Sequence, residues 1–422
     1  MREDFLHYIW KYKKFETLQL QTTGGEAISI TNIGAHNHNS GPDFFNALLV
    51  IGKQLWAGNV EIHIKSSDWY VHNHENDKNY DNVILHVVWE HDIEIFRKDK
   101  TEIPTLQLKT YVSKNVLQSF EKLFSKNEKW INCENDFSSV DDFILQNWLE
   151  RLYFERLERK ANDIEWLLKQ SNNSWEEVLF KMLAKNFGLK VNSDAFLSLA
   201  NSFDFSVLRK QQSKLQSIEA LLFGQAGLLD TDTQEHYLNE LQKEYEFIKT
   251  KFQINTIGVL SIQFFRLRPS NFPTIRLSQL ANLYYKHSNL FSKIIEAKTT
   301  KDIYNIFDVK TSVFWETHYT LNKTSKRSAK KLTNSFVDLL IINTIAPLKF
   351  SYAKHQGKIA NDIILNIIQQ LPSEKNEVVN KFNTLKNVSK SAFYSQALLQ
   401  LKNEYCDKNK CLQCAIGSVL IS

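Results

Sequence analysis

The sequence predicts an α+β protein, with a strand-rich N-terminal domain followed by a large all-helical domain. Up to about residue 115, apolar residues alternate with polar ones or form short apolar runs, which is the pattern of β-strands. From about Lys114 onward, apolar residues recur every three or four positions, which is the period of amphipathic helices. We therefore expect domains at residues 1–115 and 141–405, a connector at 116–140 and a cysteine-containing tail at 406–422.

The N-terminal domain is expected to open with a short amphipathic helix whose apolar face carries Phe5, Ile9 and Trp10. Residues 83–89 are apolar on both faces, so we expect them to form a central strand. The remaining predicted strands alternate more clearly, and each can have one solvent-exposed face. They are residues 18–21, 27–31, 44–51, 55–65, 93–97 and 105–109.

The helical domain is expected to begin with a long helix at 141–169, with Asp141 as its N-cap. Ser174 and Ser193 occupy similar capping positions further along the chain. No fixed-period repeat is present, which disfavours a solenoid. Other predicted helices are 175–185, 217–222, 232–252, 277–286, 291–297, 328–343 and 377–387.

Composition indicates an ordinary globular protein. The chain has 422 residues, enough for two or three domains, with 43% hydrophobic and 23% charged residues. A net charge of +5 does not by itself identify a nucleic-acid-binding protein. The N-terminus lacks the apolar segment of a signal peptide, and no run of about 18 apolar residues is uninterrupted. We expect a cytoplasmic protein without membrane contact, and no particular oligomeric state is predicted.

Histidine is concentrated in the N-terminal domain, where eight of the 12 histidines lie within the first 91 residues. Because histidine is the commonest metal ligand and acid–base group, this excess directs attention to that domain. His86 lies among apolar residues, so we expect a hydrogen-bonded core histidine. In an extended segment His72 and His74 would share a face as possible metal ligands, although a solvated loop explains them equally well. The eight are His7, His36, His38, His63, His72, His74, His86 and His91.

Acidic and basic residues suggest a second site in the same domain. In the predicted strand around residue 61, Glu61, His63 and Lys65 point to one face. Asp43 would join that face if the preceding hairpin has a three-residue turn or a bulge at Gly58, and would not join it with a two-residue turn. Two neighbouring carboxylates are stabilised by a divalent cation, so Asp43 and Glu61 are predicted metal ligands.

This pattern resembles the PD-(D/E)xK nuclease superfamily, in which an aspartate opens one strand and a Glu-x-Lys lies on the next. The resemblance implies a restriction-endonuclease-like fold and hydrolysis of phosphodiesters with Mg²⁺ or Mn²⁺. Asp43 and Glu61 match its metal-binding carboxylates, whereas His63 stands where lysine is expected and Lys65 could replace it. We therefore expect a metal-dependent nuclease, with His63 or Lys65 positioning water or stabilising the phosphate.

Two alternatives remain open. One is a non-catalytic nucleic-acid-binding or scaffold protein with a structural metal site. The other is a different metallohydrolase, centred on His63, His72 and His74.

The cysteines suggest a further metal site. Cys406, Cys411 and Cys414 form a Cys-x4-Cys-x2-Cys cluster, and Cys133 is the fourth cysteine. Four thiolates can bind zinc or an iron–sulfur cluster, and free thiols are the alternative. The layout partly resembles the iron staple of some recombination nucleases, which also pair one distant cysteine with three near the C-terminus.

Basic residues in the helical domain could contact a nucleic-acid backbone, although a solvated helix face is the alternative. Arg266, Arg268 and Arg276 lie near two prolines. A second group is placed near the start of the predicted helix 328–343. It consists of Lys323, Lys326, Arg327, Lys330 and Lys331.

Over nearly its whole length the chain resembles one uncharacterised bacterial family, known as domain of unknown function 2851. This resemblance implies no established activity. The resembling segments are residues 40–44, 58–63, 67–72, 219–227, 266–269, 271–273 and 411–417.

Overall fold

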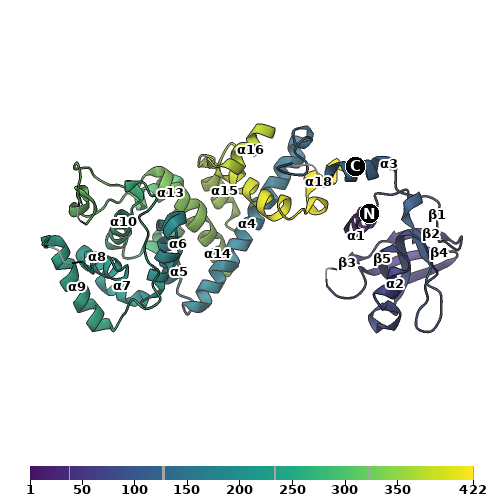
Figure 1. The fold of residues 1–422 in the computed structure, drawn as a ribbon, viewed down its shortest axis with the longest axis horizontal. Coiled ribbons are helices and arrows are strands. Elements are labelled where there is room, and N and C mark those ends of the chain that lie inside the picture. The colour runs from purple at the N-terminus through teal and green to yellow at the C-terminus, as the bar shows by residue number, and fades with distance from the viewer. Residues whose placement is uncertain (38, 126–128, 232–233, 322, 422) are drawn as a thin grey trace. The chain divides into compact units, whose positions relative to one another are not determined.

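The computed structural model describes residues 1–37, 39–125, 129–231, 234–321 and 323–421. His38 and the first two residues of the helix predicted at 232–252 lie outside these ranges. The chain forms two compact units (Figure 1). The first contains Met1–Trp148, Thr384–Lys386 and Leu401–Ser422, and the second contains Leu149–Asn383 and Asn387–Gln400. A mixed α/β region followed by a large helical region confirms the predicted α+β class.

The first unit is built on one mixed β-sheet with the strand order β1-β2-β4-β5-β6-β7, and β3 pairs with β4. β4 and β5 are antiparallel, whereas β5, β6 and β7 run parallel. β6 is buried on both faces from Val83 to Val88, which confirms the predicted central strand. The strands are β1 Leu20–Gln21, β2 Ala27–Asn32, β3 Ala35–His36, β4 Phe44–Ile51, β5 Gln54–Lys65, β6 Val83–Glu90 and β7 Thr105–Gln107.

A β-bulge in β4 decides the register at the sheet's polar face. The hairpin has a two-residue turn, which pairs Ile51 with Gln54. Further along, Ala47 pairs with Gly58 but Phe44 pairs with Val60, so β4 contains one extra residue. Asn46 has a φ of 57°, and its N–H donates to Asn59 Oδ1 at 3.3 Å. The bulge therefore lies at Asn46, opposite the predicted position at Gly58, and it brings Asp43 beside Glu61.

The connection from β5 to β6 is helical. It consists of the short helix α2 (Asp68–Val71) and two 3-10 turns, His74–Asn76 and Lys78–Tyr80. The segment through His72 and His74 is therefore not extended, and alternation along a strand does not account for their positions. The connection contributes Trp69 and Tyr80 to an apolar cluster that also contains Val83, Ile95 and Ile103.

Residues 93–97, predicted as a strand, make only an isolated bridge between Phe96 and Glu102. This segment is held by other hydrogen bonds. The Arg97 side chain donates to the carbonyl oxygen of Val83, and Tyr70 OH accepts the N–H of Phe96.

Both ends of the chain meet in the first unit. The N-terminal helix α1 (Glu3–Tyr12) packs against β5, and its buried side includes Phe5, Ile9 and Trp10 as predicted. The C-terminal segment contains the 3-10 turn Cys411–Gln413, which contacts α1, and helix α18 (Ala415–Leu420), which contacts α3 (Lys114–Leu123). Tyr8 OH lies 3.1 Å from Ser418 Oγ. The C-terminal segment is thus part of the core of this unit.

The second unit is helical. α5 packs on α6, and α8 packs on both α9 and α10. A small hairpin of β8 (His318–Thr320) and β9 (Lys323–Thr324) is the sheet found in its described residues. The helices are α4 Asp142–Gln170, which begins in the first unit, α5 Trp175–Phe187, α6 Leu189–Asn201, α7 Phe205–Gln211, α8 Leu215–Gln225, α9 His236–Phe252, α10 Pro273–Lys286, α11 Leu290–Glu296, α12 Thr300–Ile306, α13 Asn334–Leu340, α14 Ala346–His355, α15 Asn361–Gln370, α16 Glu377–Leu385, most of which belongs to this unit, and α17 Ala392–Gln400.

Two of the three predicted helix N-caps are present in the structure. Asp141 accepts the N–H groups of Phe143 and Ile144, and Ser174 accepts that of Glu177, so both cap as predicted. Ser193 instead lies inside α6, and the helix predicted from residue 328 begins only at Asn334.

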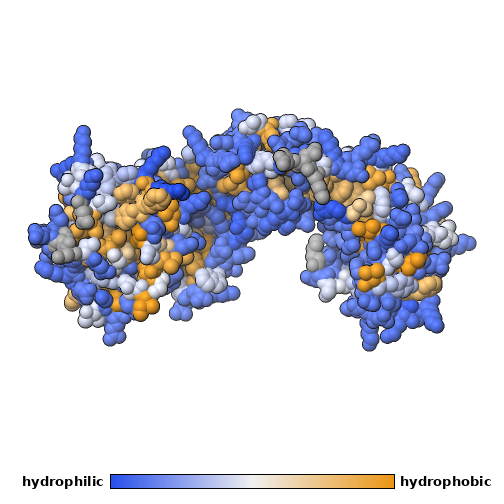
Figure 2. All heavy atoms as spheres, in the orientation of Figure 1, coloured by the Kyte–Doolittle hydropathy of each residue, from blue (hydrophilic) through white to orange (hydrophobic). Residues whose placement is uncertain are grey.

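One helical stretch, Asn334–His355, is long and apolar enough to cross a membrane by length and composition alone. Because 78% of it is buried inside the protein, it is weak evidence for a membrane span and is compatible with a core helix. The visible face of the molecule is mostly hydrophilic, with scattered apolar patches (Figure 2).

Candidate metal centre

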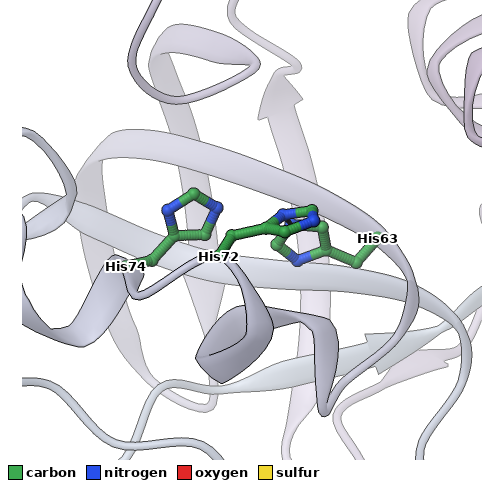
Figure 3. Close-up of side chains that lie close together, drawn as sticks. All are labelled: His63, His72 and His74. Atoms are coloured by element: carbon green, nitrogen blue, oxygen red, sulfur yellow. Dashed lines mark hydrogen bonds between the residues drawn. The ribbon is translucent and has the colours of Figure 1, made fainter.

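Three histidines converge beside the polar face of β5. His63 lies within β5, His72 directly follows α2, and His74 opens the next 3-10 turn. One ring nitrogen of each lies within 4.8 Å of the others. Figure 3 shows the rings of His63 and His72 overlapping in the view, with the ring of His74 beside them. The helical connection, which the sequence did not predict, is what brings His72 and His74 back over the strand.

The spacing of these nitrogens suits a shared metal ion. His63 Nε2 lies 3.1 Å from His72 Nδ1. Nitrogens bound at about 2.1 Å to one metal are separated by roughly 3.0 Å at an octahedral angle and roughly 3.4 Å at a tetrahedral one. The observed separation falls in this range, so the two imidazoles could bind one ion with little movement.

Glu61 faces the same histidines. Its Oε1 lies 3.3 Å from His74 Nε2 and 3.5 Å from His63 Nε2. Its Oε2 accepts the N–H of Asp43 at 3.1 Å. Burial, and then the charge of Asp43, raise the pKa of the Glu61 carboxyl well above its usual range. A bound cation would favour the ionised form, so Glu61 is suited to be a fourth ligand.

Asp43 adjoins this group and is paired with the N-terminal helix. Its Oδ2 accepts the N–H of Ile62 at 3.0 Å and lies 3.2 Å from His7 Nε2. Burial alone would lower the pKa of His7, but the hydrogen bond and charge of Asp43 outweigh it and raise that pKa. Glu3 Oε1 lies 3.9 Å from the same nitrogen. His7 belongs to the N-terminal histidine excess, but no sequence pattern places His7 or Glu3 in a site.

His86 supports His63 from beneath. His63 Nδ1 and His86 Nε2 are 2.8 Å apart, and His86 is completely buried. Burial holds the pKa of His86 well below its usual value, and burial followed by the neighbouring His74 and His72 lowers the pKa of His63 to about 3. Both rings are therefore neutral, which is the state of a metal-binding histidine. A metal-binding histidine usually donates its second N–H to an acceptor, and His86 Nε2 can accept it. The expectation of a hydrogen-bonded core histidine is confirmed.

The remaining predicted catalytic residue, Lys65, is exposed at the end of β5. Its backbone N–H donates to Asp68 Oδ2, which helps to fix the turn into α2.

The four cysteines lie around one pocket of the first unit and form no disulfide. Burial is the main reason why the pKa of Cys133 is raised to about 12 and that of Cys414 to about 11. Asn132 Nδ2 lies 3.4 Å from Cys411 Sγ. The structure thus brings together all four cysteines that the sequence suggested as a metal site.

The basic residues predicted to contact nucleic acid are in different environments. Arg266, Arg268 and Lys326 are exposed, and Arg327 pairs with Glu316 at 3.0 Å. Arg276 is buried, with its guanidinium 3.6 Å from the centre of the Phe336 ring.

Two of these residues depart from the prediction. Arg276 donates to Gln279 and Asn271, and the buried Lys330 donates to the carbonyl oxygens of Trp315 and Glu316. Their donors are therefore used within the fold. The segment from Lys323 to Lys331 is also not helical, so this group precedes the helix, which begins only at Asn334.

Residues 3–377 match a family described as a protein of unknown function (DUF2851). The chain belongs to the DUF2851 family. This match includes every residue of the histidine–carboxylate group, whereas Cys406, Cys411 and Cys414 of this DUF2851 chain lie beyond it. No curated protein and no solved structure matched the chain.

Proposed function

We propose that this protein is a metal-dependent hydrolase of phosphodiesters, with its metal held by His63, His72, His74 and Glu61. The observation that carries the proposal is the convergence of three imidazoles and one buried carboxyl group, with the Asp43–His7 pair beside them. An isolated structural site would not need that adjoining acid–base pair.

The donor set favours a metal that accepts nitrogen ligands. Mg²⁺ prefers oxygen donors and keeps several waters, and Mn²⁺ also suits carboxylate and water ligands, whereas imidazole suits Zn²⁺ and iron. Zn²⁺ or iron therefore suits this centre better than Mg²⁺ or Mn²⁺, the two ions expected from the nuclease resemblance. Asp43 is then better placed as the carboxylate partner of His7 than as a metal ligand, because its Oδ2 already accepts the N–H of Ile62 and lies 3.2 Å from His7 Nε2.

The surrounding residues can supply the remaining chemistry. A bound metal would lower the pKa of a coordinated water and polarise a phosphoryl oxygen. His7, whose pKa the hydrogen bond and charge of Asp43 raise, can donate a proton to a leaving oxygen. His86 holds His63 in its ligand orientation.

The phosphodiester class rests on the strand arrangement. Asp43 directly precedes β4 and Glu61-x-His63 lies on β5, in the order that resembles the PD-(D/E)xK nucleases. The bulge at Asn46 supports the comparison, because it places Asp43 and Glu61 within one hydrogen bond of each other. Nucleic acid is therefore the substrate to test first, with Arg266, Arg268 and Lys326 as the exposed basic residues for its backbone.

The test combines metal binding with hydrolysis. Full-length protein loaded with Mn²⁺ or Zn²⁺ is assayed on bis(p-nitrophenyl) phosphate and on single- and double-stranded DNA and RNA. His72→Ala should lose the metal and the activity together. Asp43→Asn and His7→Ala should keep the metal but lose about 100-fold or more in rate, since general acid catalysis contributes roughly that much.

Matched controls exist on the surface of the helical unit, where His236→Ala and Asp362→Asn replace exposed residues of the same types. Both should retain metal and rate. If the wild-type protein binds the metal and nucleic acid but hydrolyses none of these substrates, the hydrolase proposal is wrong. The hypothesis of a non-catalytic nucleic-acid-binding protein then takes its place. A wild-type protein that binds no divalent ion would overturn the proposed centre.

A further inference from the structure

The four cysteines of the chain enclose a pocket with largely apolar walls. Cys133 lies in the segment before α4, and the other three lie in the C-terminal segment. Leu123, Leu401 and Ile416 provide much of the wall between them. Cys133 and Cys414 are buried, and Cys406 and Cys411 are partly buried. Four thiols gathered in an apolar pocket without disulfides have few structural explanations other than a shared ligand.

The spacing of the sulfur atoms argues against a single zinc ion. Tetrahedral zinc binds each sulfur at about 2.3 Å, so all four sulfurs must lie roughly 3.8 Å apart. The ligand atoms of the three histidines lie within 4.8 Å of one another. No three of the four cysteines, all of them described, place their sulfur atoms that close together. In a four-cysteine iron–sulfur cluster at most two cysteines share one iron, so the four sulfurs are spread around an inorganic core.

Polar hydrogens are directed at these sulfurs. Cys414 accepts hydrogen bonds from the backbone N–H groups of Ile416 and Gly417, and Cys411 from Asn132. Gly417 also packs closely on the backbone of Cys411, because a Cβ there would lie 2.1 Å from the carbonyl oxygen of Cys411. Such N–H···S bonds stabilise the negative charge of ligating thiolates and tune iron–sulfur clusters.

We propose that Cys133, Cys406, Cys411 and Cys414 bind an iron–sulfur cluster. Its role is structural: it fastens the C-terminal segment to the segment before α4, within the first unit. The same C-terminal segment contacts α1, which carries His7, through the 3-10 turn Cys411–Gln413 and the Tyr8–Ser418 pair. The cluster therefore stabilises the wall of the candidate metal centre without taking part in it.

The test is the iron and acid-labile sulfide content of the full-length chain purified without oxygen, or reconstituted with ferrous iron and sulfide. We expect equal amounts of iron and sulfide, about two or about four of each per chain, which distinguishes a [2Fe–2S] from a [4Fe–4S] cluster. Visible charge-transfer absorption should accompany them. One zinc per chain bound by these cysteines, or no iron after reconstitution, would overturn the proposal.

Variants separate this site from the histidine centre. The iron content of Cys411→Ser and of Cys133→Ser should be at least tenfold lower than that of the wild type. Lys410→Ala, which changes an exposed neighbour, should keep the iron content of the wild type. His72→Ala should also keep the iron and sulfide while losing the other metal. Iron that stays in Cys411→Ser but leaves in His72→Ala would assign it to the histidines. If a cysteine variant does not fold, the iron-to-sulfide ratio and absorption of the wild type still decide the question.

Discussion

Glu219 shows how a single buried carboxyl is accommodated in the helical unit. Its side chain is 1% exposed, yet Ser278 Oγ donates to its Oε1 at 2.5 Å and Tyr237 OH to its Oε2 at 2.8 Å. Burial dominates these hydrogen bonds and raises the pKa of Glu219 to about 7. In the unfolded chain the same carboxyl has its ordinary pKa of 4.5. The folded protein thus binds the proton more tightly than the unfolded chain does.

This difference predicts a pH-dependent stability that Glu219→Gln should remove. The contribution of a raised pKa is fully present below pH 4.5 and is lost as the pH rises through about 7. Relative to the variant, the wild type should lose roughly 3 kcal/mol of unfolding free energy across that interval, at about 1.4 kcal/mol per pKa unit. Urea denaturation of both proteins between pH 4 and 8 measures it. Parallel pH profiles would show that Glu219 titrates normally in the fold.

At the residue scale, sequence reasoning found those site residues whose direction follows from strand alternation. Glu61 and His63 were placed on one face because side chains alternate along a strand. His7 was not placed there, since the contribution of a helix depends on where that helix packs, and α1 reaches β5 only in the folded unit. Arg276 and Lys330 were misjudged because the sequence does not reveal that their donors bond within the fold.

At the scale of elements, the bulge in β4 is what joins the two carboxylates. Sequence analysis named a bulge as one way to bring Asp43 to the correct face, but placed it at Gly58. The structure uses Asn46 in a left-handed conformation instead, and asparagine tolerates that conformation better than most residues. Gly58 has a different role, since a Cβ there would lie 2.4 Å from Ile84 Cγ2 on β6.

Variants of Asn46 should separate the bulge from the side chain. The side chain is exposed and it is the backbone N–H that bonds to Asn59, so Asn46→Gly should leave stability and metal binding nearly unchanged. Asn46→Val should cost about 1–2 kcal/mol, because a β-branched residue is strained at positive φ.

Deletion of Asn46 should restore the register that turns Asp43 away. The histidine centre would then keep its metal, and hydrolysis of bis(p-nitrophenyl) phosphate should fall to the level of Asp43→Asn. Full activity in the deletion variant would show that the bulge does not position Asp43.

The helical connection between β5 and β6 could not be predicted from the sequence either. The segment 66–80 is short and mostly polar, so no periodic pattern of apolar residues distinguishes a helical turn from an extended loop. The structure fixes this segment by tertiary contacts: Ser66 and Ser67 donate to Asp92, and His74 stacks on Tyr80 with ring centres 3.8 Å apart. The two serine contacts pair residues 26 and 25 positions apart in sequence, which is why the histidine triad emerged only with the fold.

At the scale of the whole molecule, the first unit is assembled from both ends of the chain. The segment from Leu401 onward lies more than 250 residues after the sheet in sequence, yet it belongs to the same compact unit. It contributes the fully or almost fully buried side chains of Leu401, Ile416 and Ile421. Folding of the first unit therefore requires completion of nearly the entire chain, whereas the segments of the second unit all end by Gln400.

A chain that ends at Gln400 should therefore lose stability in the first unit alone. Calorimetry of the full chain should show heat absorption from both units, and the truncated chain should lose or lower only the part that belongs to the first. Ile416→Ala is the milder version. It should cost about 2–5 kcal/mol in the first unit, because it leaves a cavity in a buried site.

Binding of Mn²⁺ or Zn²⁺ should weaken in the truncated chain, since α1 loses its contact with the C-terminal segment. It should be retained in Lys410→Ala, which alters only an exposed side chain of the same segment. A truncated chain with unchanged unfolding and metal affinity would mean that the C-terminal segment covers the first unit without stabilising it.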